Sequence, residues 1–109
     1  MATDVFKMKR NDTSPNISGA CNDADGVAID ITGASVRFHM KDKDGNTVVD
    51  AAASIGTAAS GEVYYAWQAA DTDVAGSFKG EFEVTYSGGA IETFPNDGYI
   101  PIRIYEDLL

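Results

Sequence analysis

The chain has 109 residues, a length that fits one domain over 1–109 with at most short flexible tails at 1–4 and 106–109. Its hydrophobic content of 44% and charged content of 23% are typical of a globular domain and exclude a fully disordered chain. With 17 acidic and 8 basic residues the formal net charge is −9, which disfavours nucleic acids and anionic membranes as partners because both repel an acidic surface.

Two-residue alternation of apolar and polar side chains begins at 5–9, returns throughout the chain and predicts β-strands. Residues 11–26 are rich in Asn, Asp, Ser and Gly and predict a loop, with room for a short strand around Ile17. The segment 77–86 shows the cleanest alternation. The full set of predicted strands is 5–9, 27–31, 36–41, 47–49, 62–67, 77–86, 90–94 and 99–105.

Turn residues separate these strands. Asp44-Gly45 predicts a tight hairpin, because both residues tolerate the positive φ of a type I′ turn. Residues 51–60 are small and bland, and they fit either a strand end followed by a loop or a short helix. Residues 69–73 predict a turn or a single helical turn. The absence of any sustained helical period predicts an all-β fold, an antiparallel β-sandwich of seven to eight short strands around one core.

The nucleophiles and bases of this sequence do not form a catalytic pattern. His39 is the single histidine, and strand alternation turns it away from the apolar face, so we interpret it as a surface residue. Cys21 is the single cysteine, and we interpret it as a small half-buried residue. Negative charge from Asp23 and Asp25 nearby would disfavour its thiolate.

The acidic residues also fit structural roles. Glu81 and Glu83 share the polar face of one strand, which is typical of a solvated surface and not of two carboxylates across a cleft. Aligning Gly26 with the invariant glycine of an EF-hand loop puts Cys21 first and Thr32 last, and aligning Gly45 fails at the same two positions. The sequence therefore predicts no catalytic, cofactor-binding or metal residue, although an irregular calcium site between loops stays open.

Exposed apolar and aromatic side chains are the remaining functional candidates. Tyr64 and Tyr105 should point outward from their strands, and tyrosine is favoured at interfaces where one end of the ring is dry and the other wet. Leu108 and Leu109 are apolar residues at the end of the sequence and could dock on a neighbour. We therefore expect these four residues at an interface, together with the segment 1–16 and the exposed strand edges.

An ordered set of segments carries a resemblance to a known family. These segments are 9–15 (KRNDTSP), 26–34 (GVAIDITGA), 36–40 (VRFHM), 61–67 (GEVYYAW), 70–72 (ADT) with Gly76, 80–84 (GEFEV) and 93–99 (TFPNDGY). In this order they resemble the immunoglobulin-like N-terminal domain of phage baseplate upper proteins. The resemblance implies residues that specify the fold and do no chemistry: Gly33, Trp67, Asp71, Gly76, Phe82 and Pro95.

The same resemblance implies a function. It predicts a non-enzymatic virion structural protein, made in the host cytoplasm, that attaches to other virion proteins in a tail, baseplate or neck and forms a homo-oligomer there. The sequence ends at Leu109 without a fibre-forming extension, which favours a small accessory protein over a baseplate arm. The alternative is a module that binds host-surface carbohydrate or decorates a capsid, for which Tyr64 and Tyr105 would have to form a stacking platform.

Overall fold

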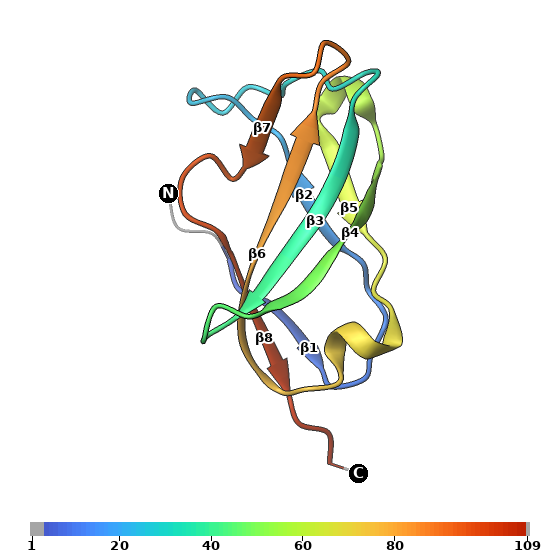
Figure 1. The fold of residues 1–109 in the computed structure, drawn as a ribbon, viewed down its shortest axis with the longest axis vertical. Coiled ribbons are helices and arrows are strands. Elements are labelled where there is room, and N and C mark those ends of the chain that lie inside the picture. The colour runs from blue at the N-terminus through green and yellow to red at the C-terminus, as the bar shows by residue number, and fades with distance from the viewer. Residues whose placement is uncertain (1–3, 109) are drawn as a thin grey trace.

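The computed structural model describes residues 4–108, and in this range the chain forms eight strands and two short 3-10 helices (Figure 1). The strands are β1 (Phe6–Lys9), β2 (Ile17–Ala20), β3 (Ser35–Asp42), β4 (Thr47–Ile55), β5 (Glu62–Tyr65), β6 (Gly76–Thr85), β7 (Ile91–Phe94) and β8 (Ile100–Tyr105). The helices are η1 (Ala58–Ser60) and η2 (Ala69–Thr72). The all-β prediction is confirmed. None of the helices between residues 4 and 108 has the length and apolar character needed to span a membrane.

The strands follow one another as a sheet that folds over into two layers. Its order is β1-β8-β6-β3-β4-β5-β2, and β7 also pairs with β6. The long strand β4 pairs with β3 over most of its length and with β5 only at Ser54 and Ile55, so it carries the chain from one layer to the other. Figure 1 shows β2 and β5 behind the β3–β6 pair. This is the predicted sandwich.

The central strand is β6, which explains why its alternation is the cleanest in the sequence. It pairs with β3 from Phe78 to Thr85, with β8 through its first half and with β7 through its second half. Along this strand Phe78, Gly80, Phe82 and Val84 are buried, and the residues between them are exposed or half-buried. The hairpin predicted at Asp44-Gly45 is also confirmed, because this dipeptide lies in the connection between β3 and β4. The predicted type I′ turn is wrong, because Gly45 has a positive φ and Asp44 does not.

An aromatic cluster fills the space between the two layers. Phe38 from β3 stacks on Tyr65 with ring centroids 5.0 Å apart and contacts Phe82 at the same distance. Trp67, just after β5, meets the rings of Phe38 and Tyr65 edge-on, at 5.7 and 5.6 Å. All four side chains are at least 96% buried. The core therefore joins strands from both layers, as apolar burial requires in a sandwich.

One strand pair differs from the predicted antiparallel arrangement. β1 runs parallel to β8, with Phe6 opposite Ile102 and Met8 opposite Ile104. An antiparallel neighbour is imposed only where a short hairpin joins two strands. A loop of seven residues separates β1 from β2, and these strands lie at opposite ends of the sheet order, so no hairpin fixes the direction of β1.

The predicted strand at 27–31 is wrong. One isolated bridge pairs Asn22 with Ala28, and Val27 is 60% exposed, although Ile31 is fully buried. The carboxylate of Asp23 accepts hydrogen bonds from the backbone N–H groups of Asp25 and Val27, and that of Asp30 accepts one from Thr32. These side chains bend the backbone locally and compete with a ladder. The ambiguous segment 51–60 divides into both alternatives, the end of β4 and the helix η1.

Among the residues expected to specify the fold, Gly33, Asp71 and Pro95 lie outside the strands, and Trp67 and Phe82 lie in the core. Asp71 accepts hydrogen bonds from the Tyr65 hydroxyl at 2.6 Å and from the backbone N–H of Gln68 at 2.8 Å, which ties η2 to β5. Burial and this carboxylate raise the pKa of Tyr65. Gly33 turns with a φ of 83°. Gly76 is the first residue of β6, and Pro95 directly follows β7.

Candidate functional site

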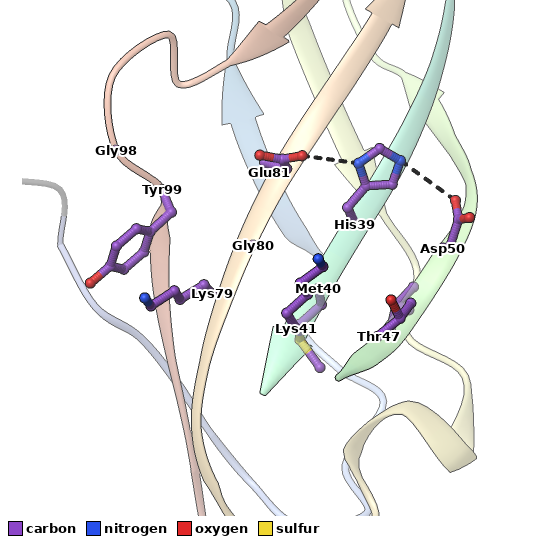
Figure 2. A pocket seen from close by; sticks show the side chains of 11 residues that line it. His39, Met40, Lys41, Thr47, Asp50, Lys79, Gly80, Glu81, Gly98 and Tyr99 are labelled. Carbon is purple, nitrogen blue, oxygen red and sulfur yellow. Dashed lines mark hydrogen bonds and ion pairs between the residues drawn. The ribbon is translucent and has the colours of Figure 1, made fainter. Parts of the chain in front are cut away.

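The outer face of the β6-β3-β4 layer carries a polar cluster centred on His39 (Figure 2). The strand register places His39 directly between Asp50 on β4 and Glu81 on β6. Its Nδ1 lies 3.0 Å from Oε2 of Glu81 and its Nε2 lies 3.5 Å from Oδ1 of Asp50. The prediction of an outward histidine is correct, but the ring is half-buried and engages a carboxylate on each side.

Arg37 extends this network along the sheet. Its Nε and Nη2 each donate to Oδ1 of Asp50 at 3.0 Å, and Nη2 also donates to the Asp50 carbonyl at 2.9 Å. Arg37 and His39 lie two residues apart on β3 and share this carboxylate. These side chains bridge three neighbouring strands, and His39, Asp50 and Glu81 line one side of a groove of about 520 Å³. Glu81 thus cross-links strands, and it does not simply face solvent as the sequence suggested.

The other wall of this groove belongs to a second feature, which we call the tyrosine–cation patch. We define it by residues exposed on the outer face of β1, β6 and β8: Lys7, Lys79, Tyr99, Arg103 and Tyr105. Nζ of Lys79 lies 4.8 Å from the centroid of the Tyr99 ring, and Cζ of Arg103 lies 5.4 Å from that of Tyr105. Figure 2 shows Lys79 and Tyr99 side by side, across β6 from His39.

Sequence reasoning identified only Tyr105 from this patch. The sequence does contain one indication of the cations in the patch, because the basic residues are unevenly distributed along the chain. None lies in 11–36 or 44–78. The structure brings all of them to strands β1, β3, β6 and β8 or to residues directly after these strands: Lys7, Lys9, Arg10, Arg37, Lys41, Lys43, Lys79 and Arg103. The spacing alone could not reveal this arrangement, because it depends on the parallel pairing of β1 with β8.

The other predicted interface residues do not join the patch. Tyr64 lies on β5 in the opposite layer and is half-buried. Tyr105 is 41% exposed at the end of β8, and Leu108 beyond it is 97% exposed. Leu109 lies outside the described residues. Tyr64 and Tyr105 therefore lie in different layers of the sandwich.

The two Asp-Gly loops considered for calcium use their leading carboxylates locally. Asp42 Oδ1 accepts hydrogen bonds from the backbone N–H groups of Asp44 and Asn46, each at 2.9 Å. The bond from Asn46 is the main cause that holds the pKa of Asp42 below its usual value. Asp23 accepts equivalent bonds in its own turn. Turn formation accounts for these two carboxylates.

Cys21 lies in a very different environment from the acidic loop that its sequence neighbours suggested. It is fully buried, not half-buried, and belongs to the hydrophobic core. Burial, with a further contribution from the charge of Glu92, raises the pKa of the thiol to about 11. The predicted weak nucleophilicity thus has burial as its main cause, in place of Asp23 and Asp25.

We expect the Cys21 thiol of the folded protein to react with a disulfide reagent at about pH 8 far more slowly than an ordinary thiol, because the reactive thiolate is scarce and inaccessible. In denaturant the same thiol should react at once. The rate of release of the coloured thiolate from Ellman's reagent measures both states. Equal rates in the folded and unfolded protein would contradict the burial of this side chain.

Comparison with solved structures gives a similar fold in another protein. The chain aligns with a structure described as the crystal structure of CopC from Methylosinus trichosporium OB3b with a TM-score of 0.55. The alignment covers 95% of this chain and 86% of that chain at 14% sequence identity. At this identity the likeness concerns the fold alone. No protein with a curated description matches the sequence.

A family comparison gives the more specific result. The model of the BppU N-terminal domain, the N-terminal domain of phage baseplate upper proteins, matches residues 22–94. The match covers about two thirds of the chain, from the loop after β2 to the end of β7, and is shorter than the resemblance expected from the sequence. Strands β1, β2 and β8 lie outside it. The chain belongs to the BppU N-terminal domain family of phage baseplate proteins.

Proposed function

We propose that this chain is a non-enzymatic structural protein of a phage virion, a small immunoglobulin-like module that attaches to other virion proteins in the baseplate, tail or neck. Membership of the BppU N-terminal domain family carries this proposal. The protein is made in the host cytoplasm and is incorporated into the particle in several copies that contact one another. It works through its surfaces.

The surroundings of the polar residues support a role in binding and not in chemistry. Both ring nitrogens of His39 face carboxylates of neighbouring strands. The Cys21 thiol is buried with a raised pKa. Trp67 and Phe82 are core residues. These residues hold the sandwich together and leave the outer faces for contacts.

Two free strand edges offer contact sites of a different kind. β1 and β2 are the first and last strands of the sheet order, and each pairs with a single neighbour. A groove of about 460 Å³ between them is lined by residues of both strands and reaches the apolar side chains of Val63 and Phe82. An unpaired edge beside an apolar groove suits an extended segment of a partner that adds as a further strand.

The proposal is tested on purified virions of the phage that encodes the chain. Quantitative mass spectrometry should find the chain in the particle in a fixed ratio to the tail proteins. The immobilised protein should also capture an identified baseplate, tail or neck protein from disrupted virions. Absence of the chain from purified particles would overturn the proposal.

Binding to host-surface carbohydrate or decoration of a capsid is the competing function. A carbohydrate site would need Tyr64 and Tyr105 as neighbouring open rings, yet they lie on strands of different layers, and Arg103 lies over Tyr105. A glycan array therefore serves as the counter-test. Specific binding that is lost in Tyr64→Ala, from a protein absent from virions, would favour this competing function.

A further inference from the structure

The tyrosine–cation patch concentrates positive charge on a chain whose net charge is −9. The parallel register places Lys7 directly opposite Arg103, with Ser77 opposite Arg103 on the other side. Like charges directly opposite on neighbouring strands destabilise a sheet. Within residues 4–108, Lys7, Lys79 and Arg103 form no ion pair with any carboxylate, although the chain has 17 acidic residues. The fold therefore tolerates electrostatic repulsion between these cations, and a bound anionic partner would offset this repulsion.

The cations of the patch are held in place by their neighbours. Arg103 donates a hydrogen bond from Nη1 to the hydroxyl of Ser77 at 2.8 Å and lies over the ring of Tyr105. Lys79 lies over Tyr99, which is 45% exposed. Cations positioned over aromatic rings lose less freedom when they bind a carboxylate. Because these cations cover one face of each ring, the patch is better suited to a carboxylate-bearing protein surface than to stacking sugars.

The chain itself carries a complementary surface at its other end. The loop 21–34 contains Asp23, Asp25 and Asp30 but no basic residue. Figure 1 shows this loop at one end of the long axis, while β1 and β8 run toward the opposite end. The molecule extends 46 Å along this axis and only 26 and 23 Å across it. The loop 21–34 therefore lies away from the patch of its own copy, although other acidic residues, such as Glu106 directly after Tyr105, lie near the patch, so a contact between loop and patch would join different copies.

We propose that the tyrosine–cation patch of one copy binds the acidic loop 21–34 of a second copy, so that copies associate head to tail. Such a contact uses two different surfaces and closes into a ring where the rotation between copies allows it. The proposal rests on the structural role proposed above and specifies which surfaces join the copies. Residues 95–109 and β1, which supply most of the patch, lie outside the family match.

The test compares the self-association of charge-reversal variants by sedimentation velocity at low and at high salt. The wild-type protein should associate as its concentration rises, and salt should weaken the association because it screens charges. Lys79→Glu combined with Arg103→Glu should weaken it by about tenfold or more, the effect expected for lost charge pairs across an interface. Lys43→Glu reverses one exposed charge at the β3–β4 turn, outside the patch, and should associate like the wild type, whereas Lys79→Glu alone should weaken the association.

A reciprocal change identifies the second surface. Asp25 is exposed, and its backbone N–H, not its carboxylate, bonds to Asp23, so Asp25→Lys preserves the turn. This variant alone should weaken self-association, and combining it with the Lys79→Glu, Arg103→Glu pair should restore part of it. Circular dichroism and thermal unfolding of each variant verify that the fold is intact.

Two results would overturn the inference. One is a wild-type protein that stays monomeric at every concentration and salt. The other is association that the patch variants leave unchanged while the fold is intact. A monomer that is still present in virions would sink this inference and leave the proposed function standing, whereas a self-associating protein absent from virions would do the reverse.

Discussion

Replacement of Phe82 by Ala is expected to lower the free energy of unfolding by about 3–5 kcal/mol, the usual cost of deleting a buried aromatic side chain. Phe82 is 1% exposed at the centre of β6, and its ring contacts Phe38 at 5.0 Å. The opposite layer cannot readily collapse onto the gap, because β6 is held between β3 on one side and β7 and β8 on the other. Domains of this size have a total stability of about 5–15 kcal/mol, so this loss is a large fraction.

Urea unfolding followed by tryptophan fluorescence measures this effect, because Trp67 belongs to the same aromatic cluster. Glu83→Ala provides the control, since this residue is next on β6 and points to the other face. The control should change the stability by about 0.5 kcal/mol or less, as most surface substitutions do. A loss below about 1 kcal/mol for Phe82→Ala would show that the two layers repack around the deleted ring, contrary to the packing described here.

Strands with one buried face were readable from the sequence. The alternation in 77–86 predicts β6 to within one residue at each end, and Asp44-Gly45 marks the β3–β4 hairpin, although only Gly45 of this pair has a positive φ. In these places local conformation and burial agree. The all-β class follows from such segments, because their period of two is a direct consequence of strand geometry.

The failed strand at 27–31 shows where this reasoning ends. Val27, Ile29 and Ile31 alternate correctly, but the carboxylate of Asp23 binds the backbone N–H of Val27, and that of Asp30 binds the backbone N–H of Thr32 directly after the segment. The alternation of apolar residues favours a strand in this segment, whereas the local hydrogen bonds favour a bent backbone, and the structure has the bent backbone. As a result Val27, which the alternation assigned to the apolar face, is exposed.

The candidate surface was harder to foresee than the fold. The His39 cluster requires the register of three strands, and the tyrosine–cation patch requires the parallel β1–β8 pairing between the two ends of the sequence. No local pattern encodes a contact between Lys7 and the strand of Arg103. What the sequence does contain is the unequal distribution of its cations, which becomes meaningful only when the topology is known.

Gly61 lies between η1 and β5, and its carbonyl accepts a hydrogen bond from the backbone N–H of Cys21 at the start of the acidic loop. Gly61→Ala is expected to lower the free energy of unfolding by about 2–5 kcal/mol. Gly61 has a φ of 66°, where a residue with a Cβ pays about 1–2 kcal/mol. An added Cβ would also lie 2.6 Å from the carbonyl oxygen of Cys21 and 2.8 Å from that of Ile29. Both oxygens belong to the backbone, so relief requires movement of the loop, and overpacking of this kind costs roughly 1–3 kcal/mol.

Gly45→Ala separates the cost of the positive φ from the cost of the close contacts made by the added Cβ. Gly45 has a φ of 85°, yet no neighbouring atom lies within 4 Å of an added Cβ, so only the conformational cost of about 1–2 kcal/mol applies. Urea unfolding of both variants should therefore show the greater loss for Gly61→Ala. Equal losses of unfolding free energy in the two variants would mean that the loop moves away from the added methyl group at little cost. A greater loss for Gly61→Ala would instead show that close packing of Gly61 against the backbone of Cys21 and Ile29 holds this end of the loop next to β5. The same packing would then fix the position of the acidic residues that the second copy is proposed to bind.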